Sequence, residues 1–219
     1  MTQALQVSVL CSDPNHPIQP LLQDWKIKQQ EDGHQVEIVE RAKHLRGGDI
    51  LLLISCVEKI TTDVRSGYQR SLVIHASDLP KGRGWSPHIW GLLEGKDQLT
   101  VTLLDAAEGI DEGAIYKQLQ LPVTKDALWD EINAALFSME LVLMDWAVAH
   151  VLATQPQPQA EQQATYYPKR TPSDSQLDAD KSIAAQWDLI RVCDPNRYPA
   201  WFSLHGHQYK VIVEKMDDE

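Results

Sequence analysis

The sequence predicts an α/β fold in which a Rossmann-like parallel sheet is flanked by helices, with a small C-terminal appendage. Runs rich in Val, Ile and Leu recur through the first half of the chain, and polar segments of helix length separate them. Strands that are apolar along their whole length are typical of a parallel sheet covered on both faces. Such a sheet places its active residues at the carboxyl ends of the strands.

Five segments are expected to be strands, in the order 5–10, 35–39, 49–55, 71–75 and 99–104. Helix-length segments connect the first three, which gives a β-α-β-α-β rhythm. A short helical stretch from Thr61 precedes the fourth strand, and a helix over residues 87–94 precedes the fifth.

The clearest helix in the sequence covers residues 126–152. Its large apolar residues recur every three or four positions, which predicts one buried face: Leu128, Ile132, Leu136, Met139, Leu143 and Trp146. Core packing explains such a stripe better than a cofactor site does.

The chain is expected to divide into three parts. Residues 1–152 form the main α/β domain, and residues 153–165 form an exposed Pro/Gln-rich linker or loop without an apolar period. Residues 166–219 form the appendage, with an amphipathic stretch over 180–192. Segments 199–204 and 208–213 around the turn His205-Gly206-His207 predict a β-hairpin.

Composition excludes several classes of protein. The net charge of −11 over 219 residues disfavours a nucleic-acid partner such as tRNA, although one local basic pocket is compatible with it. The N-terminus has neither a basic segment nor a long apolar one, and no run of eighteen apolar residues occurs, so we expect a cytoplasmic protein without a membrane partner.

The sequence predicts no metal site and no disulfide framework. The three cysteines, Cys11, Cys56 and Cys193, are far apart and lack CxxC spacing. Seven histidines lack a metal-ligating partner at a useful spacing: His16, His34, His44, His88, His150, His205 and His207.

One segment, residues 71–118, combines a histidine at a strand end, a Pro- and Gly-rich loop and the acidic turn EGIDEG. His75-Ala76-Ser77-Asp78-Leu79-Pro80, followed by Arg83-Gly84, Pro87 and Trp90, resembles the HxSxLP histidine loop of the formyltransferase family. The C-terminal stretches RTPSDS, LIR and YPAWF are similar to the sugar N-formyltransferase branch, above all the small formyltransferases of pseudaminic-acid biosynthesis.

The resemblance implies that His75 and Asp111 are the catalytic residues, because they have the family's spacing of 36 positions. An amine that attacks a formyl carbon leaves negative charge on the oxygen and positive charge on the nitrogen. His75 can donate to that oxygen, and Asp111 can receive the amine proton directly or through water. Taken alone, a strand-end histidine is more often structural, and Asp111 between two glycines is compatible with a simple turn.

The resemblance also implies 10-formyltetrahydrofolate as the formyl donor. Two loops are expected to wall its pterin ring: Cys56, Val57, Glu58, Lys59 and Ile60 after the third strand, and Ala107, Glu108, Gly109 and Ile110 after the fifth. For the first loop, an ordinary strand-to-helix connection is an equally good interpretation.

The implied acceptor is the amino group of a small-molecule nucleotide sugar. Ser77, Lys81, Arg83 and Trp85 are the candidates that bind it, by hydrogen bonding, charge and stacking. Solvated loop residues are the alternative interpretation for the last three. A homodimer is compatible with this assignment.

The sequence departs from the family at Val73, where the family has an asparagine two positions before the histidine. Valine cannot hydrogen-bond to the formyl oxygen, so Ser71, Ser77, a backbone N–H or His75 would have to substitute. Two alternative functions therefore stay open. One is a binding homologue that has lost catalysis, and the other is an enzyme of this fold, such as a hydrolase, with another acceptor.

Overall fold

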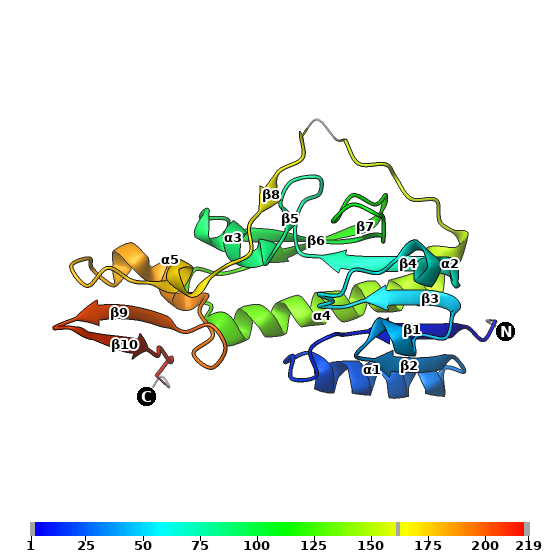
Figure 1. Cartoon of the computed structure of the whole chain (residues 1–219), viewed down its shortest axis with the longest axis horizontal. Coiled ribbons are helices and arrows are strands. Elements are labelled where there is room, and N and C mark those ends of the chain that lie inside the picture. The colour runs from blue at the N-terminus through cyan, green and yellow to red at the C-terminus, as the bar shows by residue number, and fades with distance from the viewer. Residues whose placement is uncertain (1–2, 161–162, 217–219) are drawn as a thin grey trace.

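The computed structural model describes residues 3–160 and 163–216, and its centre is a six-stranded sheet with the order β2-β1-β3-β4-β6-β7 (Figure 1). The strands are β1 (Gln6–Leu10), β2 (Gln35–Val39), β3 (Gly48–Leu53), β4 (Tyr68–His75), β6 (Gln98–Asp105) and β7 (Ile115–Pro122). The first four of these in sequence pair in parallel. In contrast, β6 runs antiparallel to β4, and β7 runs antiparallel to β6.

The predicted α/β class and all five predicted strands are confirmed, but the sheet is mixed rather than wholly parallel. β7 was not expected, because its sequence IYKQLQLP alternates polar and apolar residues and leaves several of them exposed at the sheet edge. The direction of β6 was not predictable from an apolar run, because it depends on the path of residues 76–97 between β4 and β6.

Helices α1 (Gln19–Glu31) and α4 (Trp129–His150) pack against one face of the sheet. Their apolar side chains form the main core with the strands, including Leu22, Trp25, Ile132, Leu136, Leu143, Val7, Ile50 and Leu103. The Asp145 carboxylate of α4 accepts hydrogen bonds from Trp25, Lys28 and Gln29 of α1. This acceptor joins the two helices at the edge of the core.

The helix predicted over residues 126–152 is confirmed as α4, followed by a 3-10 turn over Val151–Ala153. By length and composition alone, Trp129–Ala153 is apolar enough to cross a membrane. One face of this helix packs against the sheet, because Ile132, Leu136, Leu143 and Met144 are buried in the main core.

A smaller core covers the opposite face of the sheet and leads to the site. Leu10, Leu51, Leu53, Ile60 and Tyr68 form it, and Val73 and Ala106 pack at its margin. The short helix α2 (Thr62–Ser66) borders this core and leads directly into β4. Helix α3 (Pro87–Leu93) lies between the short strand β5 (Arg83–Gly84) and β6.

The C-terminal part packs as a separate small core around Leu177, Ile190, Cys193 and Ala200. The predicted hairpin is confirmed as β9 (Ala200–Leu204) and β10 (His207–Val211), and it lies at the end of the molecule away from the N-terminus (Figure 1). The predicted amphipathic stretch is a 3-10 turn (Ala184–Gln186) followed by the short helix α5 (Trp187–Arg191).

The Pro/Gln-rich tract is described over residues 153–160 and 163–165, and most of these residues are exposed or half-exposed. It is nevertheless attached to the main domain. Gln157 exchanges two backbone hydrogen bonds with Ile115 at the start of β7. Beyond the tract, β8 (Tyr166–Tyr167) pairs in parallel with β5. The tract therefore returns the chain across the loops that follow β4 and β6.

Candidate active site

His75 is the last residue of β4, and the structure brings it together with Asp111. The His75 Nδ1 atom lies 3.5 Å from Asp111 Oδ2, and both side chains are at most 10% exposed. On the other side of the ring, Nε2 lies 2.8 Å from the Gly82 carbonyl oxygen and donates to it. Because Nε2 donates its proton to the Gly82 carbonyl, Nδ1 is the ring nitrogen left to act on a substrate, and it faces Asp111.

Asp111 is held in place by its loop rather than by a regular element. Its backbone is in the left-handed region, with φ at 54°, which costs a non-glycine residue conformational energy. Its Oδ2 atom accepts a hydrogen bond of 2.9 Å from the Gly84 N–H. Gly113 permits the loop to close, because a Cβ atom there would lie 1.8 Å from the Asp105 carbonyl oxygen. The carboxylate is thus oriented toward His75 before any ligand binds.

Gln159, from the Pro/Gln-rich tract, fixes the same loop from outside. Its Nε2 donates to the carbonyl oxygens of Asp111 (2.8 Å) and Gly113 (2.7 Å). Its Oε1 accepts from the Arg83 guanidinium at 2.7 and 3.2 Å. One glutamine therefore connects the Asp111 loop to the histidine loop.

The return of the chain after the tract holds the histidine loop from the other side. The Thr165 side chain accepts from the Gly82 N–H at 2.8 Å, and its carbonyl accepts from the Arg83 N–H at 2.9 Å. Gly84 meets Tyr167 so closely that a Cβ atom would lie 2.5 Å from the Tyr167 carbonyl oxygen. These contacts set the position of the Gly82 carbonyl that binds His75.

The first predicted wall, Cys56–Ile60, lies after β3 and is ordered by local contacts. The Glu58 carboxylate accepts from the Ala42 N–H and pairs with Arg41, and the Cys56 thiol donates to the Glu58 carbonyl oxygen. Burial raises the pKa of the Cys56 thiol. Within this wall Val57 and Lys59 are exposed, whereas Ile60 is buried.

The second predicted wall, Ala107–Ile110, follows β6 and is largely exposed. The two walls approach each other, because a single atom, Arg65 Nη1, donates to the Ile60 carbonyl oxygen at 2.7 Å and to the Ala107 carbonyl oxygen at 3.2 Å. Each wall also exposes one large apolar side chain: Val57 is 67% exposed and Ile110 is 63% exposed.

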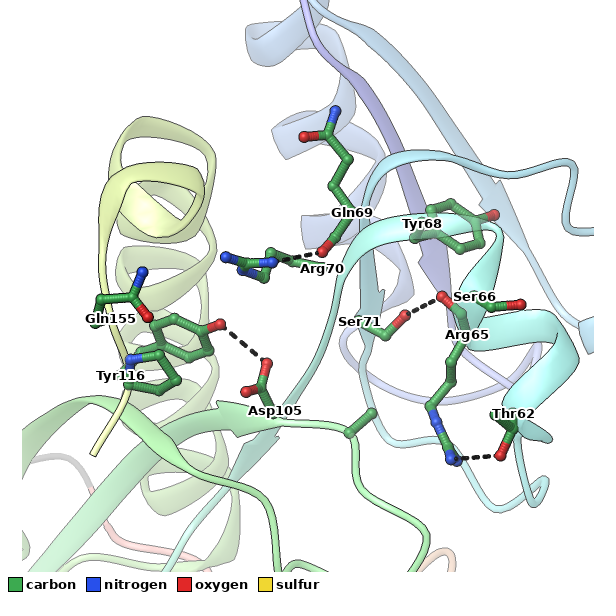
Figure 2. A pocket seen from close by; sticks show the side chains of 12 residues that line it. Thr62, Arg65, Ser66, Tyr68, Gln69, Arg70, Ser71, Asp105, Tyr116 and Gln155 are labelled. Atoms are coloured by element: carbon green, nitrogen blue, oxygen red, sulfur yellow. Dashed lines mark hydrogen bonds between the residues drawn. The ribbon is translucent and has the colours of Figure 1, made fainter. Parts of the chain in front are cut away.

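A cavity of about 550 Å³ lies beside the second wall, where β4 begins and β6 ends (Figure 2). Figure 2 shows the Asp105 and Tyr116 side chains joined across one side of it and Arg65 extending toward Thr62 on the other. Burial raises the pKa of Asp105, and burial together with the Asp105 charge raises the pKa of Tyr116 to about 12. The cavity lining therefore combines ionisable side chains with apolar surface.

Val73 shares its face of β4 with Ser71 and His75, because positions two apart on a strand point the same way. It is half-buried at the margin of the smaller core. The Ser71 hydroxyl donates to the Arg65 carbonyl oxygen at 3.3 Å. The Ser77 hydroxyl is buried without a hydrogen-bond partner among the described residues. Neither serine therefore presents a free, exposed hydroxyl where the family has its asparagine amide.

The predicted acceptor-binding residues fall into two groups. Lys81 and Trp85 are exposed, Trp85 at 38%, and the Lys169 ammonium lies 4.9 Å from the centre of the Trp85 ring. Ser77 and Arg83 are buried. The Arg83 guanidinium contacts Gln159, the Tyr166 hydroxyl and Glu112. It therefore links the histidine loop to the Asp111 loop and to the chain after the Pro/Gln-rich tract.

His88 belongs to α3, which follows the histidine loop. Burial, together with the charge of His75, lowers the pKa of His88 to about 4, so this ring is neutral at physiological pH. Within residues 3–160 and 163–216, no group of three or more His, Cys, Asp or Glu side chains is arranged to hold a metal ion.

Four important groups were not predicted from sequence: the Gly82 carbonyl, the Gly84 N–H, Gln159 and Arg65. The first two belong to the loop that the sequence singled out, but backbone groups carry no residue signal. Gln159 lies 48 positions from Asp111, within a tract whose composition indicates only a linker. The proximity of Arg65 to the second wall likewise depends on a contact across 42 positions.

Comparison with known proteins identifies the family of this chain. The family model described as "Formyl transferase" matches residues 5–148. Methionyl-tRNA formyltransferase from Heliobacterium modesticaldum is 30% identical over 154 residues, which are 69% of this chain and 48% of that protein. The chain spans about half the length of the curated relatives it matches, with 48, 44 and 43% of three of them covered.

Three solved structures show the same fold over nearly all of this chain. Methionyl-tRNA formyltransferase from Clostridium thermocellum has a TM-score of 0.82 at 20% identity and covers 97% of this chain and 94% of its own. HypX from Aquifex aeolicus in complex with tetrahydrofolic acid has a TM-score of 0.76 at 20% identity, with 94 and 37% covered. A sugar N-formyltransferase from Shewanella sp FDAARGOS_354 has a TM-score of 0.74 at 15% identity, with 98 and 99% covered.

The matched region spans β4, the histidine loop and the Asp111 loop, whereas Gln159 and Thr165 lie beyond it. The chain belongs to the formyl transferase family.

Proposed function

We propose that this chain is an N-formyltransferase that moves a formyl group from 10-formyltetrahydrofolate to the amino group of a nucleotide-linked sugar. The observation that carries the proposal is the buried His75–Asp111 pair, positioned by the Gly82 carbonyl and the Gly84 N–H within a formyl transferase domain. Preorganised acid–base groups of this kind are what acyl transfer to an amine requires.

The residues of the two walls carry groups that match the hydrogen-bonding edge and the flat ring of the donor's pterin. Two carbonyl oxygens, of Ile60 and Ala107, converge on one position and so favour a ligand edge that carries N–H donors. Val57 and Ile110 offer apolar surface for a flat ring. When bound, 10-formyltetrahydrofolate would supply a formyl carbon open to attack by an amine. A structural neighbour, HypX, is described in complex with tetrahydrofolic acid, in keeping with a reduced folate here.

His75 and Asp111 divide the proton transfer between them. The attacking amine must lose a proton, and Asp111 Oδ2 and His75 Nδ1 provide two acceptors 3.5 Å apart. The Gly84 N–H orients the Asp111 carboxylate, and the Gly82 carbonyl fixes the imidazole ring on its far side. The amine is therefore expected to enter on the Asp111 side of His75.

The surface beside the histidine loop favours a nucleotide-linked acceptor. Trp85 exposes an aromatic face for a base, while Lys169 and Lys81 supply positive charge for phosphates. The net charge of −11 makes a polyanion such as tRNA a poorer acceptor. The sequence likeness to pseudaminic-acid formyltransferases points to an amino sugar of that type.

An acceptor screen tests the proposal. The purified chain would be given 10-formyltetrahydrofolate with each of a panel of nucleotide-linked amino sugars, and with initiator methionyl-tRNA as a competing acceptor, while donor conversion is followed by absorbance. We expect conversion to depend on an amino sugar. Conversion only with methionyl-tRNA would assign the acceptor differently, and conversion without any amine would indicate a hydrolase.

Val73 favours one second candidate, a folate-binding homologue without catalysis, because the Ser71 hydroxyl is bonded to Arg65 and the unbonded Ser77 hydroxyl is buried, so neither replaces the family asparagine. That function predicts binding of tetrahydrofolate without turnover of any acceptor in the same screen.

A further inference from the structure

The side chain of Arg65 lies across the opening between the two predicted pterin walls. It extends from α2, and its Nη1 donates to the carbonyl oxygens of Ile60 and Ala107 at 2.7 and 3.2 Å. Its Nη2 donates to the Thr62 hydroxyl at 3.0 Å, as Figure 2 shows. The guanidinium therefore holds together two loops that lie 47 positions apart in sequence, from residue 60 to residue 107.

The two carbonyls are the acceptors that the proposed donor would need. A guanidinium and the 2-amino-pyrimidinone edge of a pterin share a planar N–C–N arrangement that presents N–H groups side by side. A carbonyl oxygen that is already bonded to Arg65 is less available to a second donor. In the ligand-free chain, Arg65 thus satisfies acceptors that would otherwise be left for the pterin.

Arg65 is held by neutral groups only and has space to move. In the parts of the chain that the structure describes, no carboxylate pairs with its guanidinium. The cavity of about 550 Å³ adjoins it, with Ser66, Gln69 and Gln155 on its lining. Release of the side chain therefore breaks three hydrogen bonds but separates no ion pair.

We propose that Arg65 is a placeholder that occupies the pterin position in the empty enzyme and must swing into the cavity before a reduced folate binds. This inference rests on the proposed folate donor. Only the molecules in which Arg65 has moved away can then bind the folate. The apparent Kd therefore equals the intrinsic Kd divided by the fraction of such molecules.

The test is calorimetric titration of tetrahydrofolate into the wild-type chain and into Arg65→Ala. Arg70→Ala is the matched control, because Arg70 lines the same cavity and donates to the neighbouring Gln69 carbonyl, but to neither wall among the described residues. We expect Arg65→Ala to bind at least about tenfold more tightly than the wild type, and Arg70→Ala to bind like the wild type. Ethylguanidinium should compete with tetrahydrofolate in Arg65→Ala and not in the wild-type chain.

The outcomes separate this inference from the proposed function. Normal binding by the wild type with equal or weaker binding by Arg65→Ala would overturn the placeholder role alone. Absence of binding by both proteins would overturn the folate donor and the placeholder role together. Should Arg65→Ala fail to give a cooperative thermal transition, Arg65→Lys replaces it, with an intermediate gain in affinity as the expected result and no gain as the contrary one.

Discussion

His75 is buried between the Gly82 carbonyl and the Asp111 carboxylate, so its side chain contacts polar groups and is not part of an apolar core cluster. We expect His75→Ala to fold normally and to lose at least about a hundredfold in kcat, the usual contribution of a positioned acid–base group. Thermal unfolding measured beside turnover separates the two effects. Wild-type turnover in a folded His75→Ala protein would remove His75 from the mechanism.

Asp111→Asn keeps the size of the side chain and can still accept the Gly84 N–H, but it removes the charge and the proton acceptor. We expect kcat and kcat/KM to fall together, because the lost interaction belongs to the transition state. Steady-state kinetics over the acceptor concentration would show this. A rise in KM with unchanged kcat would mean that Asp111 only binds substrate.

Val73→Asn returns an amide to the position that the family uses, on the strand face that Val73 shares with His75. Val73 is half-buried at the edge of the smaller core, so we expect the substitution to be tolerated. Turnover should be equal to or above that of the wild type, because one oxyanion donor is worth about a hundredfold where it is well placed. Loss of all turnover in a folded variant would show that another group already occupies that role.

At the scale of elements, the strap formed by residues 153–160 and 163–167 belongs to the candidate site, because Gln159 and Thr165 contact the Asp111 loop and the histidine loop. We expect Gln159→Ala to lower kcat about tenfold with little change in the KM for the acceptor, since two hydrogen bonds from Arg83 and two to backbone carbonyls are lost. Gln157→Ala is the control, because Gln157 joins β7 through its backbone only. Equal kinetics for the two variants would exclude a positioning role for Gln159.

The elements that sequence predicts well are those with a strong period or an unbroken apolar run. Helix α4 and strands β1 to β3 are of this kind, and the β9–β10 hairpin follows from its turn. Strand β7 was missed because its exposed edge gives a weak pattern, and the direction of β6 depends on tertiary packing. Within the site, motif residues were predictable, whereas Gln159 and Arg65 act through contacts that only the folded chain creates.

For the molecule as a whole, Glu140 is a buried carboxyl in the interior that the site does not use. Glu140 of α4 is buried, and its Oε2 has no hydrogen-bond partner among the described residues. Burial raises the pKa of Glu140 to about 8, whereas the unfolded chain loses the same proton near pH 4 to 5. Between these values the native state holds more protons than the unfolded state, so this group lowers stability as the pH rises through the window.

We therefore expect Glu140→Gln to raise the free energy of unfolding by about 3 kcal/mol near pH 7, and to have little effect at pH 4. Urea unfolding at several pH values measures this difference. Glu31→Gln, at the exposed end of α1, should show no such pH dependence. A Glu140→Gln effect that stays constant with pH would mean that its carboxyl does not titrate in this window.

In the function proposed above, this chain transfers a formyl group to an amine through His75 and Asp111. The most direct measurement uses 10-formyltetrahydrofolate with an isotope-labelled formyl group, a nucleotide-linked amino sugar, and mass spectrometry of the products formed by the wild type and by His75→Ala. We predict labelled N-formyl sugar from the wild type and almost none from His75→Ala. Labelled free formate without formylated sugar, or equal product from both proteins, would contradict the account.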